Sequence, residues 1–400
     1  MLCHLMPYKI WYLDMQKHFL IFSTFLLFSR TIYASDSIAT YSNIVRKTPS
    51  DWNTRYELAK LYFNAHQYSA AQYNFEFITA QCDTPDTIKN ATNKYLSEIR
   101  HNKKWDTEFG IGAIPDSSIN YSPSNRYECI NTSNGPICSE LRYNPSGFGL
   151  NINGALNYYA NIYKNLGLRT TFGGAVLNTS NDIPTDYSTH FAIGPRYIFS
   201  NGDIFIQPSF GTRFYNNHLY NTSYGARIGG TLQFPSRLFT DTALDIKHNH
   251  YHDEHINDIL SGFDWTFYIH PKYYLNNHSF ISFTAAISHN ETAISALGSD
   301  TGRIAIGYFY KIPYGFNFYI NAMYSHSEYH TSGTFVIDNE FHHTIRHDNI
   351  YQIYTRIYNS YINLYNFIPA ISYTYTIQES NIPAYDHHTH QAMLEIVRMF

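Results

Sequence analysis

The feature that most constrains this chain is an alternation of side-chain type that begins after residue 104 and continues to the C-terminus. In one segment Ile204, Ile206 and Phe210 alternate with Gln207 and Ser209, and the same period of two recurs in many other segments. Successive side chains of a β-strand point to opposite faces, so this period predicts strands with one apolar face. The segments are long for a soluble protein and suit a tilted membrane strand of roughly 9–11 residues.

We mark out about fourteen such segments, each of the length of a membrane strand. They lie at 104–114, 147–158, 164–177, 189–199, 203–214, 222–234, 237–247, 258–269, 278–289, 301–311, 314–325, 348–358, 366–376 and 390–400. Tight turns such as 200–203 and 311–314 separate some neighbours, and long polar stretches such as 115–146 and 326–347 separate others. This pattern predicts a mainly β protein, a 14-stranded antiparallel transmembrane outer-membrane β-barrel over 104–400, with both barrel ends on the short-turn side.

Composition supports the barrel and excludes other classes. The chain has 38 Tyr, 28 Phe and 4 Trp, and only 14% of its residues are charged, against roughly 25% in soluble domains. Mean hydropathy is −0.34, and no apolar run reaches the roughly 18–20 residues of a spanning helix, which excludes a polytopic helical membrane protein. A soluble β-sandwich would not explain the aromatic density. The formal net charge of −4 gives no reason to expect a nucleic acid partner.

The N-terminus predicts export from the cytoplasm. A short basic segment that begins at Met15 precedes an apolar run at 19–28, and the small residue Ala34 stands before Ser35. This is the layout of a secretory signal peptide, and the run is too short for a membrane anchor. We therefore expect residues 1–34 to be the signal peptide, with Met15 as an alternative start.

Residues 35–103 have the period of helices instead. The residues at the offsets of one tetratricopeptide repeat are Leu58, Ala59, Tyr62, Tyr68, Ala71 and Phe75. Small side chains at 59 and 71 would let two helices approach closely, and a third helix at about 85–101 would cover their exposed side. Because one repeat cannot bury its own face, residues 36–47 are expected to add a half-unit.

We weigh two roles for this small helical domain equally. One is a plug or spacer, and the other is a docking surface for a client protein in the periplasm. The tyrosines expected on such a surface are Tyr56, Tyr62, Tyr68 and Tyr73.

Cysteines and histidines supply the remaining candidate sites. Cys129 and Cys138 lie close together in a polar stretch, and we expect them to form a disulfide in an oxidising compartment, with two unpaired thiols as the alternative. His248, His250 and His252 lie in a histidine-rich stretch, and imidazoles two residues apart on a strand point the same way and could share a metal. We favour the simpler interpretation, that they fill a polar loop, and expect no metal and no cofactor.

The order of these regions resembles a known family, on motifs that span about residues 50–400. The motifs are Lys103-Lys104-Trp105 at the junction, Pro115-Asp116-Ser117-Ser118-Ile119-Asn120 after the first strand, 369–375, Glu379-Ser380-Asn381-Ile382, Tyr385-Asp386 and the last strand to Phe400. The chain resembles the surface lipoprotein assembly modifiers, an outer-membrane translocon family that joins a periplasmic tetratricopeptide-type domain to a fourteen-strand barrel. Its helical domain is shorter than the repeat arrays of the better-known members.

The resemblance implies a location in the outer membrane, with the helical domain in the periplasm. It also implies three partners: a client surface lipoprotein or secreted protein, a periplasmic chaperone, and the machinery that assembles barrels in the membrane. The first hypothesis for function is therefore a translocon-type protein that promotes export or surface display of such a client.

The alternative function is a passive outer-membrane porin or nutrient channel, in which inward-facing polar residues line a wet lumen. Those residues are Asn151, Asn153, Asn157, Arg169, Ser372 and Thr374. An adhesin or receptor that uses the long loops has no specific residue in its support. No nucleophile elbow, phosphate loop, HExxH or paired-carboxylate motif occurs, so we do not expect an enzyme.

Overall fold

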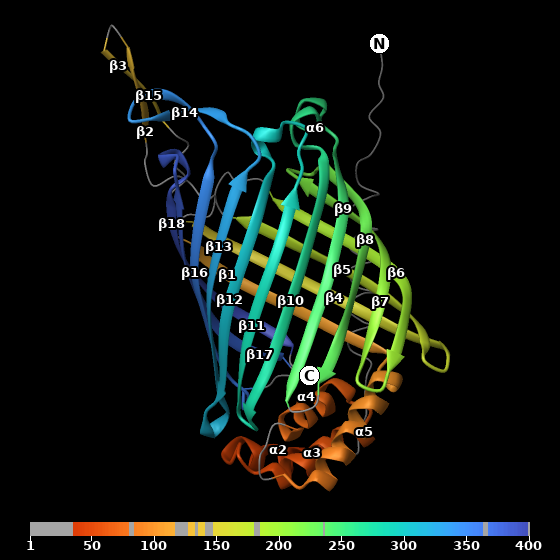
Figure 1. Cartoon of the computed structure of the whole chain (residues 1–400). Coiled ribbons are helices and arrows are strands. Elements are labelled where there is room, and N and C mark those ends of the chain that lie inside the picture. Colours follow the sequence, from red (N-terminus) through yellow and green to blue (C-terminus); the bar gives the residue numbers. More distant parts are fainter. Residues whose placement is uncertain are drawn as a thin grey trace, which may run out of the picture.

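In a computed structural model of the chain, a closed barrel stands on a small bundle of helices (Figure 1). The structure describes residues 35–79, 84–116, 127–132, 135–140, 147–179, 185–234, 237–362 and 367–398. The expected signal peptide, 1–34, lies outside these residues. Among the helices that are described, none has the length and apolar character needed to cross a membrane.

Fourteen antiparallel strands form the barrel, and β1 closes it by pairing with both β4 and β18. The strands are β1 (Trp105–Asp116), β4 (Gly147–Tyr163), β5 (Leu166–Thr179), β6 (Asp186–Phe199), β7 (Gly202–Tyr215), β8 (His218–Phe234), β9 (Leu238–Tyr251), β10 (Gly262–Asn276), β11 (Ser279–Asn290), β12 (Ser299–Lys311), β13 (Phe316–Tyr329), β16 (His347–Asn359), β17 (Phe367–Ser380) and β18 (His387–Arg398). Each predicted segment overlaps one of these strands, so the fourteen-strand prediction is confirmed. Many strands run further than predicted, because cross-strand pairing continues past the apolar band.

The two faces of the strands differ as the alternation predicts. On β7, Ile204 and Ile206 point outward and are 53% and 50% exposed. Phe205 and Gln207, which alternate with them, point inward and are 6% and 1% exposed. The inward face carries polar contacts as well, and the Asn157 Oδ1 accepts hydrogen bonds from Arg169 and Thr171 across β4 and β5. The outward face is therefore the lipid-facing surface, and the inward face is held by packing and hydrogen bonds.

The end of the barrel away from the helices carries elements that the alternation did not predict. Two hairpins, β2 (Tyr127–Thr132) with β3 (Gly135–Glu140) and β14 (Gly333–Ile337) with β15 (Glu340–Thr344), form separate two-stranded sheets there, and α6 (Glu254–Leu260) joins β9 to β10. One connection at this end is short. Asn216 and Asn217 have φ of 52° and 62° and link β7 to β8 in two residues, as asparagine allows in a tight hairpin.

The helical domain consists of α2 (Ser35–Lys47), α3 (Trp52–Asn64), α4 (Tyr68–Thr79) and α5 (Asp86–Asn102). The third helix and the half-unit thus lie where the sequence predicts them. Helix α3 begins at an Asp51 cap, whose side chain accepts a hydrogen bond from the Thr54 amide at 3.1 Å.

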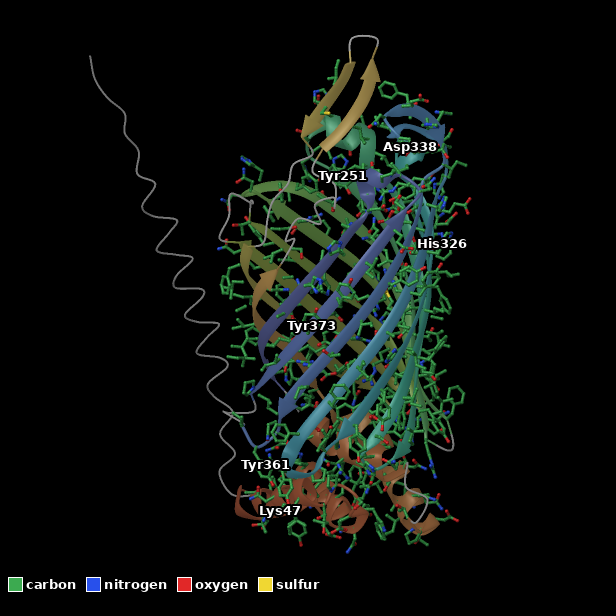
Figure 2. All side chains as sticks on the ribbon, turned by 90° about the vertical axis from the view of Figure 1, so that its left-hand side faces the viewer. Lys47, Tyr251, His326, Asp338, Tyr361 and Tyr373 are labelled. Atoms are coloured by element: carbon green, nitrogen blue, oxygen red, sulfur yellow. The ribbon has the colours of Figure 1, made fainter. Side chains whose placement is uncertain are left out.

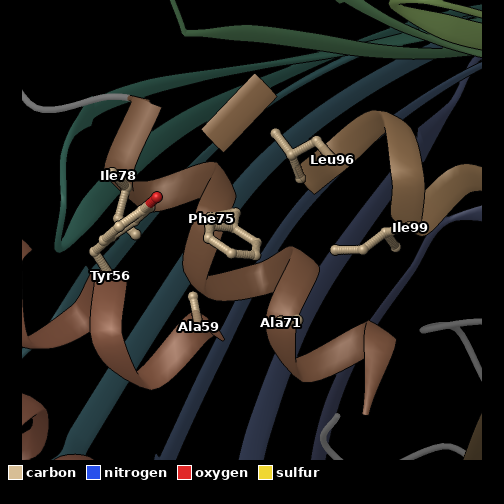
Figure 3. Close-up of a cluster of buried hydrophobic side chains, with 7 residues drawn as sticks. All are labelled: Tyr56, Ala59, Ala71, Phe75, Ile78, Leu96 and Ile99. Carbon is tan, nitrogen blue, oxygen red and sulfur yellow. The ribbon is translucent and has the colours of Figure 1, made fainter. Parts of the chain in front are cut away.

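Helices α3, α4 and α5 pack around one apolar core (Figure 3). The core residues are Tyr56, Ala59, Ala71, Phe75, Ile78, Leu96 and Ile99. Ala59 and Ala71 are both 0% exposed, which fits their predicted role of letting α3 and α4 approach closely. The aromatic rings of Phe75 and Tyr95 stack at 4.9 Å between centroids and join α4 to α5.

Candidate functional site at the barrel mouth

The helical domain lies at the short-turn end of the barrel (Figure 1), and side-chain contacts join the two parts at or beside each connection there. Six connections lie there, β4–β5, β6–β7, β8–β9, β10–β11, β12–β13 and β16–β17. In that order, the side-chain contacts at or beside them are His101–Asn165, Arg100–Ser200, Asn93–Gln233, Glu76–Tyr274, Tyr73–Lys311 and Arg46–Tyr361. Tyr361 and Lys47, near the end of α2, both lie at this end in Figure 2. The domain therefore reaches all six of these turns.

One aromatic side chain of α4 enters the barrel. Phe77 is 0% exposed and packs edge-on against Tyr274 of β10 at 4.8 Å between ring centroids. It also lies 6.3 Å from the ring of Phe280 and 6.2 Å from that of Phe309, which stack on each other at 4.8 Å. Tyr358 and two apolar residues of β17 complete this mouth cluster. Rings from helix and barrel thus pack into one cluster at this part of the mouth.

Two buried cations flank this aromatic cluster. The Lys311 Nζ lies 3.6 Å from the ring centroid of Phe77 and 4.2 Å from that of Tyr73, and the residue is 9% exposed. Arg55 of α3 is 1% exposed, and its guanidinium lies 5.4 Å from the Phe77 ring. It donates to the Pro49 carbonyl at 2.9 Å, and burial lowers the pKa of Arg55 to about 10.

No ion pair with a carboxylate is formed by Lys311 or Arg55 within the described part of the chain. The aromatic faces supply cation–π attraction instead, which is worth about 2 kcal/mol or more at a desolvated site. Without a carboxylate partner, the interactions of a buried cation only partly offset the free energy of hydration that it loses. The interface is thus extensive, yet it buries the basic groups of Lys311 and Arg55 without a carboxylate partner among the described residues.

Polar contacts fix the domain around this centre. The Tyr274 hydroxyl donates to the Glu76 carboxylate at 2.7 Å, and burial raises the pKa of the Tyr73 phenol well above its ordinary value. On the opposite side Arg196 donates to the backbone carbonyl of Arg100 at 3.3 Å, close to the C-terminus of α5. Arg196 also forms a buried ion pair with Asp203. A cation is favourable at a helix C-terminus, so this pair ties α5 to the β6–β7 turn.

The four tyrosines expected on a docking surface lie in different surroundings. Tyr56 is 9% exposed in the core of the helical domain, and Tyr73 packs against the mouth cluster of the barrel. Tyr62 and Tyr68 are only partly buried against that core, and Tyr68 contacts the ring of Phe63 at 5.6 Å. Docking of a client stays a prediction: Tyr62, Tyr68 and Tyr73 are each partly buried, and of these only Tyr73 packs against the mouth cluster of the barrel.

The predicted cysteine pair lies in the β2–β3 hairpin. Cys138 is disulfide-bonded, and the backbone register places Cys129 directly opposite it. The side chain of Cys129 lies outside the described residues, so its identity as the partner stays a prediction.

The predicted histidine stretch lies near the far end of β9. His248 stacks on Tyr224 at 5.2 Å between ring centroids, and the rings of His250 and His252 are 5.3 Å apart. The His252 Nε2 lies 2.6 Å from the Thr222 hydroxyl. These imidazoles therefore have ring or hydrogen-bond partners of their own.

The mouth cluster was missed by the sequence analysis, although α4 carries a signal for it. Phe75 and Ile78 lie on the helix face that packs into the domain core, whereas Tyr73 and Phe77, four residues apart, form a second apolar stripe on another face. Two apolar stripes on one helix require two partners. The second partner of α4 is the barrel.

Comparison with known proteins relates this architecture to a family. Residues 105–400 match the family model of the surface lipoprotein assembly modifiers. Surface lipoprotein assembly modifier 1 of Haemophilus influenzae is 28% identical over 91 residues, which cover 23% of this chain and 19% of that protein. The aligned part is thus less than a fifth of that relative.

Solved outer-membrane barrels are similar in fold alone. A loop-deletion mutant of OmpT from Vibrio cholerae has a TM-score of 0.38 and 9% identity, covering 73% of this chain and 98% of that one. The toluene transporter TodX of P. putida has a TM-score of 0.40 and 7% identity, covering 74% and 90% respectively. Since the family model extends over the whole barrel from Trp105 to the C-terminus, the chain belongs to the surface lipoprotein assembly modifier family.

Proposed function

We propose that this outer-membrane protein promotes the export or surface display of a client protein, either a surface lipoprotein or a secreted protein, without catalysing a reaction. In this proposal the helical domain lies in the periplasm, since the short turns of an outer-membrane barrel face that side. It covers the mouth at rest and moves off the rim when a client engages it. Family membership supports the class of client.

The observation that carries the proposal is the packing of Phe77 and its neighbours against the barrel mouth. A passive porin gains nothing from a folded domain that contacts all six turns of its entrance. A translocon does gain from it, because a wide unplugged barrel would leak small solutes between transport events. The buried Lys311 favours this view, since parting the two surfaces would relieve the cost of its burial.

Docking of the client is assigned to the side of the helical domain that the barrel leaves free. Tyr62 and Tyr68 are partly exposed there beside Phe63, and aromatic side chains of this kind are enriched at protein interfaces. The same surface is available to a periplasmic chaperone that delivers the client. The barrel assembly machinery is proposed as a partner only during insertion into the membrane.

A reversible lock tests the movement. Glu76 and Tyr274 meet across the interface, so both are changed to Cys, with Cys82 changed to Ser, and joined by a reductant-cleavable thiol-reactive linker of matching length. We expect cross-linked cells to lose one or a few proteins from their biotinylated surface proteome and to regain them on reduction. Each single-Cys variant, treated in the same way, is the matched control. An unchanged surface proteome in locked cells would overturn the proposal.

Electrical recording separates the translocon from the porin. Purified full-length protein in a planar bilayer should be silent or flicker rarely, because the helices cover the mouth. A variant that lacks residues 36–100 should conduct steadily, provided that its heat-modifiable gel mobility shows a folded barrel. Steady large conductance from the intact protein would favour the passive porin instead.

A further inference from the structure

A second cluster of side chains lies at the opposite end of the molecule, on the outer face of the barrel. It consists of His289 near the end of β11, Asp300 near the start of β12 and His330 just after β13. One ligand atom from each residue can be chosen so that all three lie within 4.8 Å of one another. We propose that these three residues form a binding site for a divalent transition-metal ion of the Zn²⁺, Ni²⁺ and Cu²⁺ class.

The geometry is close to what such an ion requires. The His289 Nδ1 lies 2.6 Å from the Asp300 Oδ1, and the His330 Nε2 lies 3.5 Å from the Asp300 Oδ2. Ligand atoms at about 2.1 Å from Zn²⁺ in tetrahedral arrangement are about 3.4 Å apart. All three ligand atoms lie within 4.8 Å of one another, so no pair has to approach by more than about 1.4 Å, and binding would replace the direct contact between His289 and Asp300.

The donor set matches this class of metal. Two imidazoles and one carboxylate are ligands that Zn²⁺, Ni²⁺ and Cu²⁺ accept readily, whereas Ca²⁺ and Mg²⁺ prefer oxygen alone. Three protein ligands leave at least one position for water. The cluster is the one group among the described residues whose His, Cys, Asp and Glu side chains converge in this way. The predicted histidine stretch at 248–252 does not.

The surroundings hold the histidines in place. His289 and Asp300 are direct partners in the β11–β12 register, so their side chains lie on the same face. The amide of His330 donates to the Gly298 carbonyl at 3.0 Å. A Cβ at residue 298 would lie 2.7 Å from the His330 Nδ1, so glycine is what allows the ring to approach.

One ligand atom is also left unsatisfied. The His330 Nε2 is inaccessible to solvent and makes no hydrogen bond to any described atom. It faces the Asp300 carboxylate across the gap of 3.5 Å. A buried polar atom without a partner carries a cost that a metal ion in this gap would remove.

The site reaches the surface through Asp300, whose side chain is 64% exposed, while the His330 Nε2 lies beneath it. Two residues before His289, Ile287 is 53% exposed on the lipid-facing side of β11, and Ile304 on β12 is 51% exposed. Trp265 stacks on His289 with 6.1 Å between ring centroids, as expected of an aromatic residue at the membrane–water boundary. His326 lies on β13 four residues before His330 and toward this end of the barrel in Figure 2. A bound ion would clamp the 291–298 loop to the segment after β13.

The test uses the full-length protein in detergent with Zn²⁺ as the probe in titration calorimetry. We expect one equivalent to bind, and His289→Ala or His330→Ala to weaken binding by at least 100-fold, since even outer-shell partners are worth roughly 10–100-fold. His326→Ala, and a variant with both His250 and His252 changed to Ala, should bind like the intact protein. Asp300→Asn keeps the shape of the side chain but removes its negative charge and one acceptor oxygen, and it should also lose binding.

A second measurement locates the ion. Ni²⁺ should quench tryptophan fluorescence through Trp265, and Trp265→Phe should abolish that change without affecting Zn²⁺ binding. Heat-modifiable mobility checks that every variant retains its barrel. The proposal is overturned if the intact protein binds no Zn²⁺, or if folded His289→Ala and His330→Ala variants bind it as tightly as before.

Discussion

Truncation of Phe77 should release the helical domain from the barrel without unfolding either part. The ring is 0% exposed and lies against Tyr274, Phe280 and Phe309, with the Lys311 Nζ 3.6 Å from its centroid. Replacing a fully buried Phe by Ala costs roughly 3–5 kcal/mol, and loss of a desolvated cation–π contact is included in that range. Because these partners belong to the barrel, the cost falls on docking.

A change of 3–5 kcal/mol alters the equilibrium between docked and released helices by roughly two to four orders of magnitude. Hydrogen exchange of the full-length protein in detergent reports that equilibrium. In Phe77→Ala we expect faster exchange in α4 and at the helix-side ends of β10–β12, with α3 and α5 still protected. The barrel itself should keep its heat-modifiable mobility.

Two matched substitutions make this prediction specific. Phe75 lies two residues earlier on the same helix but packs into the domain core, so Phe75→Ala should deprotect α3, α4 and α5 together. Phe341 is 66% exposed on the β14–β15 hairpin, so Phe341→Ala should change nothing near the helices. If Phe77→Ala exchanges like Phe341→Ala, packing at the mouth is not what holds the domain in place.

Three further predictions concern charge, pH and the outer hairpin. Burial and the nearby Arg55 lower the pKa of His278 in the β10–β11 turn. The helical domain should therefore dock fully on the barrel above about pH 6.5, and docking should weaken at lower pH, where His278 must take up a proton. Hydrogen exchange at pH 7.5 and 5.5 measures this change, and His278→Gln should remove the pH dependence. Asp203→Asn strands the buried Arg196 and should cost roughly 3–5 kcal/mol, seen as a lower temperature for loss of heat-modifiable mobility. Cys129→Ser should leave a thiol that a maleimide labels at the cell surface, and absence of labelling would contradict the proposed disulfide.

The barrel was predictable because its signal is local and repeated. Alternation with a period of two marks each strand independently, so an error at one strand leaves the others intact. The sequence analysis did not predict the hairpins β2–β3 and β14–β15, because polar loops show no apolar alternation. The two-residue link at Asn216 and Asn217 was also missed, since long loops were expected on that side.

The two sites differ in what the sequence could have revealed. Tyr73 and Phe77 form a second apolar stripe on α4 that can be recognised in the sequence, although the stripe does not indicate that the barrel is its partner. His289, Asp300 and His330 are separated by 11 and 30 residues, and they meet only because of the register of β11, β12 and β13. A slip of one residue would turn one of them to the lumen, so no spacing rule in the sequence could bring them together.

The charge of Lys311 offers a final test, in which removal of a buried cation strengthens an interface. Lys311→Met keeps a flexible side chain of similar volume against Tyr73 and Phe77 but removes the cost of burying an ammonium group. Replacing a buried charge by a packed apolar residue is often neutral or stabilising by roughly 1–4 kcal/mol. We therefore expect slower hydrogen exchange in α4 than in the intact protein, together with reduced surface display of the client.

The opposite result has a clear meaning. If Lys311→Met releases the helices as Phe77→Ala does, the cation–π attraction exceeds the desolvation cost, and Lys311 stabilises docking of the helices on the barrel. If the helices hold more tightly but display is unchanged, docking and transport are independent, which contradicts the gating proposed for the domain. Lys272→Met is the matched control. The Lys272 Nζ also lies over an aromatic ring, 5.3 Å from the centroid of Phe280, but this ring belongs to the barrel and not to α4. Of these two lysine variants, only Lys311→Met should therefore change docking and display together.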